Sequence, residues 1–390
     1  MLEQQWQNGC ATKQVFPTRD NDVVTCIQFD RNRVVAGFEN TRILVYDIND
    51  AGVVNELVGH EGGVWALGLV GNTVVSGSTD RTVRVWNVTT GRCTHVFHGH
   101  SSTVRCLQIM LPVDVRTAAQ RRAGVTAIYE PEFPLIVTGS RDSTLRVWKL
   151  PEPDTENSMQ SEPYSDEGYE EGDAYLMYVW VGHSQSVRAV TSVGALAISG
   201  SYDNTIRVWD TVTGECLRTL VGHVDKVYSL AVDEERRIIF SGSMDGDIRQ
   251  WSLDTGACLR TLEGHITLVG LLSFRNNVLV SGGADSTLRV WDTETGQQMC
   301  VLEGHTGPIT CFQHDGIKVV SGGDSTIKLW NLKTGKFVRN ISAGLGNIWQ
   351  VDFDGKRLVT AVRANDVTFV EVFNYGGNVA DDCSCDNLLL

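Results

Sequence analysis

The sequence predicts an all-β protein, an eight-bladed β-propeller with four-stranded antiparallel blades. A phrase of the form SGSxDxTxRVW recurs along the chain, and the aromatic residue that ends each copy returns about every 40 residues. A Gly-His pair precedes six of the copies. Each copy also contains short apolar runs separated by Gly and Asp, which is typical of strands and tight turns. Internal repeats of this length indicate an array of identical supersecondary units.

A single copy of the repeat predicts the four strands of one blade. In the fifth copy VYSLAV, RRIIFSGS and DIRQW alternate or run apolar, and TGACLRTL follows as a fourth strand. A single sheet cannot bury both faces, whereas eight sheets in a ring can, and closure leaves only short edges. The copies end at these aromatic residues: Tyr46, Trp86, Trp148, Trp209, Trp251, Trp291, Trp330 and Phe373. The Gly-His pairs end at these histidines: His60, His100, His183, His223, His265 and His305.

These repeats place the propeller at 22–375. We expect a strand near 13–16, within the N-terminal segment 1–21, to complete the last blade. Two insertions lengthen the third blade, at 111–134 between its first two strands and at 151–175 between its last two, and both leave from the bottom face. The second insertion holds nine Asp or Glu and no Lys or Arg, which is typical of disorder, and we expect the tail 376–390 to be disordered as well.

Composition excludes several classes of protein. The formal net charge of −14 disfavours binding to nucleic acid or to an anionic membrane. No apolar run is long enough for a transmembrane helix, and the first residues lack the pattern of a secretory signal. The ten cysteines form no CxxC pairs, which argues against zinc and against a disulfide framework. We therefore expect no metal or cofactor, a reducing compartment, and residence in the nucleus and cytoplasm.

The cysteines recur at two repeat positions. Cys26, Cys106 and Cys311 share one position, and Cys93, Cys216 and Cys258 share another that follows a TG turn. Such repetition is typical of small buried hydrophobic residues, so we expect both sets to be buried.

Each full repeat contains Ser, His and Asp, the residue types of a hydrolase triad. Because the trio recurs in nearly identical copies, we interpret it as a structural hydrogen-bond network that also includes the Trp indole. The repeated arginines before VW receive the same interpretation: Arg84, Arg146, Arg207 and Arg289. Function should therefore lie in residues that do not repeat.

Strand direction places the Gly-His loop and the Asp turn on one face of the ring, which we call the top. Two non-repeating positions lie on it, one after the first Val of a blade and one before the turn Asp. On blades 2, 3 and 4 these positions and their neighbours include four arginines: Arg81, Arg105, Arg141 and Arg188. Blades 6 and 7 carry small residues in the matching places: Gly270, Ala284 and Thr310.

A cluster of arginines in an acidic chain needs an explanation, because like charges repel. The guanidinium offers a rigid fork of donors suited to phosphate or carboxylate, so the cluster predicts an anion-binding site. Trp65, at a top position beside it, could supply an apolar wall. Two alternatives remain open: the arginines could pair with nearby Asp or Glu, and Trp65 could be an ordinary core residue.

The repeat pattern, with its Gly-His pair, turn Asp and WD or WN ending, resembles the WD-repeat family. Several strings resemble one branch in particular, the propellers of F-box substrate receptors of SCF ubiquitin ligases, of the fungal cell-division-control type. These strings include GHEGGVWAL, SGSTDRTVRVW, CTHVFHGHSSTVRCL, LIVTGSRDSTLRVWKLP, SGSYDNTIRVWD, HITLVGLL and NIWQVDFDGKRLVTAV. That branch binds phosphodegrons, short peptides with phosphothreonine or phosphoserine before proline.

The resemblance implies roles for individual residues. Arg105, Arg141 and Arg188 match arginines that hold the central phosphate, and Tyr202 matches their tyrosine partner. Trp65, Thr79 and Thr103 match the pocket for the adjacent proline. Arg81 matches a peripheral arginine, Lys226 a basic position near a second phosphate, and Arg363 an arginine of the last blade.

The resemblance also implies an F-box before the propeller. Residues 1–21 cannot hold that motif, so we expect it to be absent from this chain, and docking to the Skp-type adaptor and cullin would need an F-box supplied from outside it. The sequence thus favours a non-catalytic, phosphodegron-binding substrate receptor over two alternatives. One is a generic propeller scaffold for unphosphorylated peptides, and the other is a propeller enzyme, for which no phosphate loop or convergent catalytic group is found.

Overall fold

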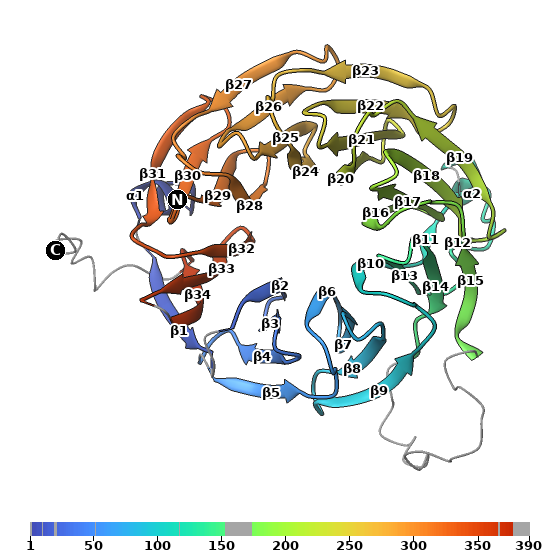
Figure 1. Ribbon diagram of the computed structural model, residues 1–390, viewed down its shortest axis with the longest axis horizontal. Coiled ribbons are helices and arrows are strands. Elements are labelled where there is room, and N and C mark those ends of the chain that lie inside the picture. The colour runs from blue at the N-terminus through green and yellow to red at the C-terminus, as the bar shows by residue number, and fades with distance from the viewer. Residues whose placement is uncertain are drawn as a thin grey trace.

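The computed structural model describes residues 2–9, 11–18, 22–50, 52–116, 118–152, 174–365 and 367–376. Within them, eight four-stranded antiparallel sheets form a closed ring around a central channel (Figure 1). The predicted fold class is confirmed. The strands of each blade are called a to d from the channel outward.

Blades 1 to 4 occupy the first half of the ring. Blade 1 contains β2 (Val24–Phe29), β3 (Arg33–Phe38), β4 (Ile43–Asp47) and β5 (Val53–Leu57). Blade 2 contains β6 (Val64–Val70), β7 (Thr73–Ser78), β8 (Val83–Asn87) and β9 (Arg92–Phe97). Blade 3 contains β10 (Val104–Met110), β13 (Leu135–Ser140), β14 (Leu145–Lys149) and β15 (Leu176–Trp180). Blade 4 contains β16 (Val187–Val193), β17 (Leu196–Ser201), β18 (Thr205–Asp210) and β19 (Cys216–Val221).

Blades 5 to 8 complete the ring. Blade 5 contains β20 (Val227–Asp233), β21 (Ile238–Ser243), β22 (Ile248–Ser252) and β23 (Cys258–Leu262). Blade 6 contains β24 (Val269–Arg275), β25 (Val278–Gly283), β26 (Leu288–Asp292) and β27 (Gln298–Leu302). Blade 7 contains β28 (Ile309–His314), β29 (Lys318–Gly323), β30 (Thr326–Asn331) and β31 (Lys336–Ser342). Blade 8 contains β32 (Ile348–Phe353), β33 (Arg357–Ala364), β34 (Val367–Asn374) and the N-terminal β1 (Thr12–Pro17).

The two ends of the chain close the ring. β1 is strand d of blade 8 and pairs antiparallel with β34, with Phe16 opposite Val370. The inner strands of successive blades contact each other around the channel, including β32 of the last blade with β2 of the first. Closure in this way leaves each blade only one short free edge, its strand d.

Blade 3 alone carries the long connections predicted for it. The segment between β10 and β13 contains β11 (Val113–Asp114), α2 (Ala118–Arg122) and β12 (Tyr129–Glu130), with β11 pairing β12. The second insertion lies mostly in 153–173, outside the described residues, as do 377–390 of the tail. Among the described residues, no helix is long and apolar enough to cross a membrane.

The core lies between blades. One cluster combines Val35 and Val45 of blade 1 with Val64 and Trp86 of blade 2, and similar clusters repeat around the ring. Each sheet therefore buries its face against the next sheet. Burial of apolar area contributes roughly 25 cal/mol per Å², so removing a blade would expose its neighbours as well.

The Ser, His and Asp of each repeat form the predicted hydrogen-bond network. In blade 4 the His183 Nδ1 lies 2.9 Å from Asp203 Oδ2, and its Nε2 lies 2.8 Å from Ser199 Oγ, which also accepts the Trp209 indole N–H at 2.8 Å. The same arrangement recurs in blades 2 to 7, and blade 3 uses Thr138 in place of serine. The imidazole therefore links the turn Asp to the hydroxyl of strand b, and the hydroxyl links it to the indole. The network is structural, as predicted.

The network should make folding stability depend on pH. Burial lowers the pKa of the His60, His265 and His305 side chains below 6.5, and it outweighs the neighbouring Asp. Burial alone raises the pKa of Asp245, but hydrogen bonds led by that from His223 lower it to about 2. Both kinds of group have a folded pKa below the unfolded one, so the unfolded chain binds more protons on acidification. We expect unfolding free energy to fall as pH drops below about 6.5, and more steeply below about 4.

Urea denaturation at pH values from 8 to 3 measures this. Two carboxyl groups act in the opposite direction. Burial raises the pKa of Asp247 and raises that of Asp352 to about 6, so the contribution of Asp352 is present below pH 4 and lost as pH rises through 6. Four histidines with lowered pKa values, His314 included, outnumber these two acids. A stability that stayed level or rose between pH 7 and pH 5 would contradict the prediction.

A short helix at the N-terminus covers the bottom of the seam between blades 7 and 8. α1 (Leu2–Asn8) lies beside this seam in Figure 1. Its Trp6 is fully buried, stacks on Tyr375 with ring centroids 3.9 Å apart, and donates its indole N–H to the Gly355 carbonyl at 3.2 Å. This helix was not predicted from the sequence. Seven residues are too few for a helix to be stable by itself, so packing holds it.

The predicted burial of the cysteines is half correct. Cys311 is buried, and Cys26 and Cys106 are half-buried against core clusters. Burial raises the pKa of all three thiols to about 12. Cys216 and Cys258 are exposed, so that part of the prediction is wrong. The reason is that both residues begin a strand d, the outer edge of a blade, and repetition of a position does not by itself imply burial.

Candidate functional site

Backbone geometry defines a first ring of eight residues at the top of the channel. In every blade the pairing of strands a and b shifts register at the second residue of strand a, which marks a β-bulge. Bulges re-aim a side chain out of the regular pleat. The bulged residues, from blade 1 to blade 8, are Thr25, Trp65, Arg105, Arg188, Tyr228, Gly270, Thr310 and Trp349.

A second ring follows strand b. In six blades the residue directly after this strand donates its N–H to the carbonyl of the residue that precedes strand a, as Arg141 does to Thr103 at 2.9 Å. In blade 8 Arg363, which lies within β33, makes the equivalent bond. The residues so held are Glu39, Thr79, Arg141, Tyr202, Met244, Ala284 and Arg363. The two rings contain the positions that the sequence pattern placed on the top face, and their backbones are fixed in the same way in each blade.

Four side chains of these rings converge on blades 3 and 4. Arg105 lies close enough to Arg188 and Arg141 to be repelled by both, and its guanidinium is within hydrogen-bonding reach of Tyr202. We call Arg105, Arg141, Arg188 and Tyr202 the arginine–tyrosine cluster. Burial first, and then the two neighbouring arginines, lower the pKa of Arg105. The cluster therefore concentrates positive charge that lacks full hydration.

No acidic side chain in the part of the chain that the structure describes forms an ion pair with these arginines. Within the described ranges, none of the recorded ion pairs involves Arg105, Arg141 or Arg188, although several other arginines pair with Asp or Glu. The alternative in which the three arginines pair with neighbouring acids is therefore not observed. Arg141 and Arg188 both repel Arg105, and none of the three has an ion-pair partner among the described residues. This arrangement favours an anion as the missing partner.

Aromatic side chains border the cluster on both sides. The Arg105 guanidinium lies 4.5 Å from the centre of the Trp65 ring, a cation–π distance that orients the guanidinium. Trp65 is half-buried and lies outside the apolar clusters between blades, so it is not an ordinary core residue. On the other side, the Lys226 ammonium lies 5.6 Å from the centre of the Tyr202 ring.

Tyr228 belongs to the site but was not among the predicted residues. Its ring centre lies 5.8 Å from the Arg188 guanidinium and 5.1 Å from the Tyr202 ring. Burial, followed by hydrogen bonding to Tyr202, raises the pKa of Tyr228 to about 12, so its hydroxyl keeps its proton and can donate. Its place in the first ring was visible in the sequence. Its contact with blade 4 was not, because that contact depends on how blades 4 and 5 pack.

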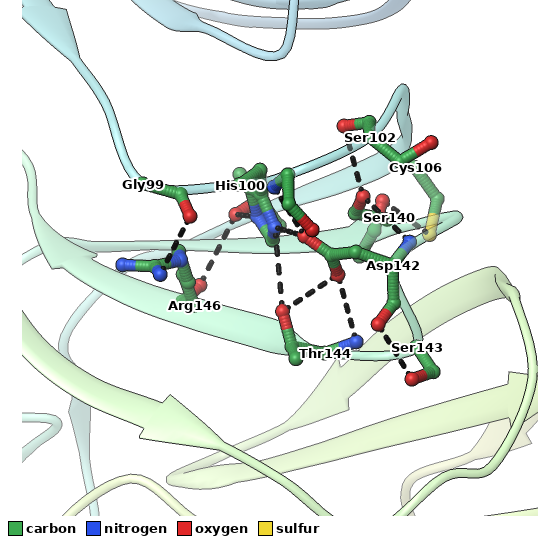
Figure 2. Close-up of polar contacts among 12 residues, drawn as sticks. Gly99, His100, Ser102, Cys106, Ser140, Asp142, Ser143, Thr144 and Arg146 are labelled. Carbon is green, nitrogen blue, oxygen red and sulfur yellow. Dashed lines mark hydrogen bonds and ion pairs between the residues drawn. The ribbon is translucent and has the colours of Figure 1, made fainter.

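Blade 3 holds Arg141 in a rigid turn. Arg141 lies between Ser140 and Asp142, and both neighbours are fixed by the network shown in Figure 2. Ser140 donates its hydroxyl to the Ser102 carbonyl at 3.0 Å, and Asp142 accepts from His100 at 2.9 Å. The repeated network thus positions the non-repeated residue, which reduces the entropy lost when a ligand binds.

The other predicted residues lie farther out. Thr79 is exposed and its side chain packs over Gly62 on blade 2. Thr103 is half-buried, and its carbonyl holds Arg141 in place. Arg81 is exposed in a left-handed conformation with φ of 74°. The structure therefore puts Thr79 and Arg81 on blade 2, the blade that also carries Trp65 and neighbours the cluster.

Arg363 does not join the cluster. Its N–H donates to the Asn347 carbonyl at 2.7 Å, so it occupies the second-ring position of blade 8 and is the structural equivalent of Arg141. In a ring of eight, blade 8 lies opposite blade 4, so the channel separates Arg363 from Arg188.

The cluster supplies hydrogen-bond donors and positive charge, and it contains no carboxylate, imidazole or thiol. Such a set can hold an anion with several oxygens but offers no general base. Among the described residues, no group of three or more His, Cys, Asp or Glu is arranged to hold a metal ion.

The fold and the site define a repeat propeller in which blades 2 to 7 share one structural network and blades 3 and 4 alone carry the arginine–tyrosine cluster. The family described as WD domain, G-beta repeat matches residues 52–87, 91–149, 175–210, 214–252, 256–292 and 296–331. The chain therefore belongs to the WD-repeat family.

Individual relatives narrow the comparison. The chain is 47% identical over 365 residues to the WD repeat-containing protein pop2 of Schizosaccharomyces pombe, covering 92% of this chain and 50% of that one. It is 47% identical over 363 residues to cell division control protein 4 of Candida albicans, covering 91% and 52%. The chain thus spans about half the length of these relatives. A solved structure of the computationally designed Ika8 protein superimposes with a TM-score of 0.72 at 29% identity, covering 92% of this chain and 99% of that one.

Proposed function

We propose that this chain is a phosphodegron-binding substrate-recognition module of an SCF-type ubiquitin ligase. It would present phosphorylated proteins for ubiquitylation and degradation and would not itself be an enzyme. The observation that carries the proposal is the convergence of Arg105, Arg141 and Arg188 on one sector without an acidic partner among the described residues. The similarity to cell division control protein 4 supports the same role.

The geometry suits a phosphate followed by proline. A phosphate has three oxygens that can accept from several guanidiniums at once, and each such charge-assisted bond contributes roughly 1.5–3 kcal/mol. Trp65, next to Arg105, offers an apolar wall for a proline ring beside the phosphate. Lys226 and Arg81 extend the positive surface on either side, which suits a peptide with a second phosphate.

The ligase half of the proposal concerns the whole protein. The chain spans about half the length of its relatives, and docking to a Skp-type adaptor and cullin is part of what we propose for the whole protein. We further propose residence in the nucleus and cytoplasm, which fits a chain whose described cysteines are all free thiols.

Fluorescence anisotropy with one labelled Thr-Pro peptide, phosphorylated and unmodified, tests the proposal. We expect the phosphorylated peptide to bind at least about 100-fold more tightly, because the arginines lose their ligand when the phosphate is removed. A peptide with Glu in place of phosphothreonine is the control, since a carboxylate has fewer acceptor oxygens and less charge. If phosphorylated and unmodified peptides bind equally, the protein is a general interaction scaffold and the proposal is wrong.

A further inference from the structure

The most exposed apolar side chains of the described residues lie on the top face of blades 5 and 6. Val224 and Ile266 are 78% and 84% exposed, more than any other large hydrophobic residue that the structure describes. Each directly follows the histidine of a Gly-His pair, and the equivalent residues of the other such pairs are polar: Glu61, Ser101, Ser184 and Thr306. The repeat therefore has no structural need for an apolar residue at this position.

A turn of blade 5 lies between the two loops that carry these side chains. The Val224 N–H donates to Asp245 Oδ2 at 3.1 Å. In the same turn, Gly246 lies so close to the entry loop of blade 6 that a Cβ on it would come within 3.1 Å of the carbonyl oxygen of His265, the residue before Ile266. Val224, the turn 245–247 and Ile266 are therefore neighbours on the top face.

Asp247 departs from the repeat in this turn. In the other five blades with a Gly-His pair, the equivalent residue is a threonine whose hydroxyl donates to the turn Asp at 2.7–2.8 Å, namely Thr82, Thr144, Thr205, Thr287 and Thr326. Asp247 keeps the backbone N–H bond to Asp245, at 3.0 Å, but an ionised carboxylate cannot replace the hydroxyl donor. The change removes a hydrogen bond and places two carboxylates in one turn, so it does not serve the fold.

Glu263 adds another carboxylate beside Asp247. Burial, the charge of the turn Asp and then the charge of Glu263 raise the pKa of Asp247, while the Arg249 guanidinium acts in the opposite direction. Within the described residues, neither Asp247 nor Glu263 is part of a recorded ion pair. We call Val224, Asp247, Glu263 and Ile266 the rim surface. Its exposed apolar side chains and unpaired carboxylates are complementary to aliphatic and cationic side chains.

The rim surface and Trp65 lie on opposite sides of the arginine–tyrosine cluster. Blade 5 adjoins the cluster on one side, where Tyr228 contacts Arg188 and Tyr202, and Trp65 of blade 2 contacts Arg105 on the other. With the phosphate at the cluster and the following proline at Trp65, the residues before the phosphoresidue run toward blade 5. About ten extended residues, at about 3.3 Å each, exceed the roughly 15 Å width of a four-stranded blade.

We propose that the rim surface binds the segment N-terminal to the phosphoresidue and selects ligands in which that segment carries aliphatic and cationic side chains. Val224 and Ile266 contact the aliphatic side chains, and Asp247 and Glu263 attract Lys or Arg. The inference rests on the proposed phosphopeptide function, and it adds a requirement on ligand sequence beyond the phosphate and the proline.

Three peptides with one phosphothreonine–proline core test the proposal by fluorescence anisotropy. The first has an N-terminal extension of about ten residues in which Leu and Lys alternate with Gly and Ser. The second has an extension of Gly and Ser alone, and the third carries the Leu and Lys residues after the proline instead. We expect the first to bind about tenfold more tightly than the other two, because an exposed ion pair and a partly buried aliphatic contact each change a Kd by about threefold.

The third peptide is the control for charge, because it has the same composition as the first and is attracted equally to a chain of net charge −14. Asp247→Thr and Ile266→Thr introduce the residues of equivalent blades. Each should reduce the advantage of the first peptide about threefold and change the affinity for the second by less than about twofold. Glu303→Gln is the matched control for Glu263→Gln, because Glu303 precedes the Gly-His pair of blade 7, where Thr306 replaces Ile266.

The outcomes separate this proposal from the function on which it rests. If the first peptide binds no more tightly than the second or the third, or if either Asp247→Thr or Ile266→Thr leaves its advantage unchanged, the proposal is wrong and the phosphopeptide function stands. If none of the three peptides binds, the proposed function itself fails, and this proposal fails with it.

Discussion

Replacing Arg141 or Arg188 with Ala is expected to weaken phosphopeptide binding by about 100-fold or more while leaving the fold intact. Each arginine can donate two charge-assisted hydrogen bonds to one phosphate, so its removal costs about 3 kcal/mol or more of binding free energy. Stability should change by less than about 0.5 kcal/mol, because Arg141 is exposed and neither arginine has an ion pair among the described residues. Anisotropy titration and thermal melting measure the two effects on the same samples.

The direction of the small stability change is informative. Arg105, Arg141 and Arg188 repel one another, so either variant should melt at the same temperature as the wild type or slightly above it. Arg92→Ala is the matched control, because Arg92 is also exposed but begins β9 at the bottom of blade 2. A marked loss of melting temperature in Arg141→Ala would show a structural role instead, and unchanged binding would remove the cluster from the ligand site.

Trp6→Ala is expected to destabilise the propeller by about 3–5 kcal/mol, the usual cost of truncating a buried Trp. Trp6 is fully buried against Tyr375 and Phe353, with ring centroids 3.9 and 5.5 Å away, and the Lys318 ammonium lies 4.9 Å from its ring. Lys318 belongs to blade 7 and the two aromatic residues to blade 8, so the loss affects both sides of the seam between these blades and should be measured as global unfolding. Urea denaturation gives the free energy directly.

Two further variants in α1 distinguish the contribution of the buried Trp6 side chain from the effect of a substitution at an exposed position of the same helix. Trp6→Phe keeps an aromatic ring over Tyr375 but loses the hydrogen bond to Gly355, and it should cost less than Trp6→Ala. Gln7→Ala changes an exposed residue and should alter stability by less than about 0.5 kcal/mol. If Trp6→Ala unfolded at the same urea concentration as Gln7→Ala, α1 would contribute nothing to the stability of the seam between blades 7 and 8.

Much of the site was accessible from the sequence because its positions are locally encoded. The turn Asp and the first Val of each repeat mark where strands end, and strand alternation then shows which residues reach the top face. Arg105, Arg141 and Arg188 were found in this way, and the structure places them together. The β-bulge that re-aims Arg105 and Arg188 was not predicted, but it recurs in every blade and so leaves the order of residues around the ring unchanged.

The sequence pattern could not predict which side chains of neighbouring blades contact one another. Tyr228 enters the site through its approach to Tyr202 and Arg188 of the neighbouring blade. Arg218 reaches the turn before Cys258 in the same manner. Arg363 aligned poorly in sequence, and only its backbone hydrogen bond to Asn347 identifies it as the equivalent of Arg141.

The sequence by itself determined the fold class, the number of blades, the structural nature of the Ser-His-Asp trio and the sector that carries the arginines. All of these depend on strand period, turn residues and repetition, which are properties of short stretches of chain. Only the tertiary structure decided that α1 covers the seam, that Arg105 stacks on Trp65, that Tyr228 joins the cluster, and that Cys216 and Cys258 face solvent. These features depend on how sheets distant in sequence pack against one another, and side-chain packing between sheets leaves no periodic signal in the chain.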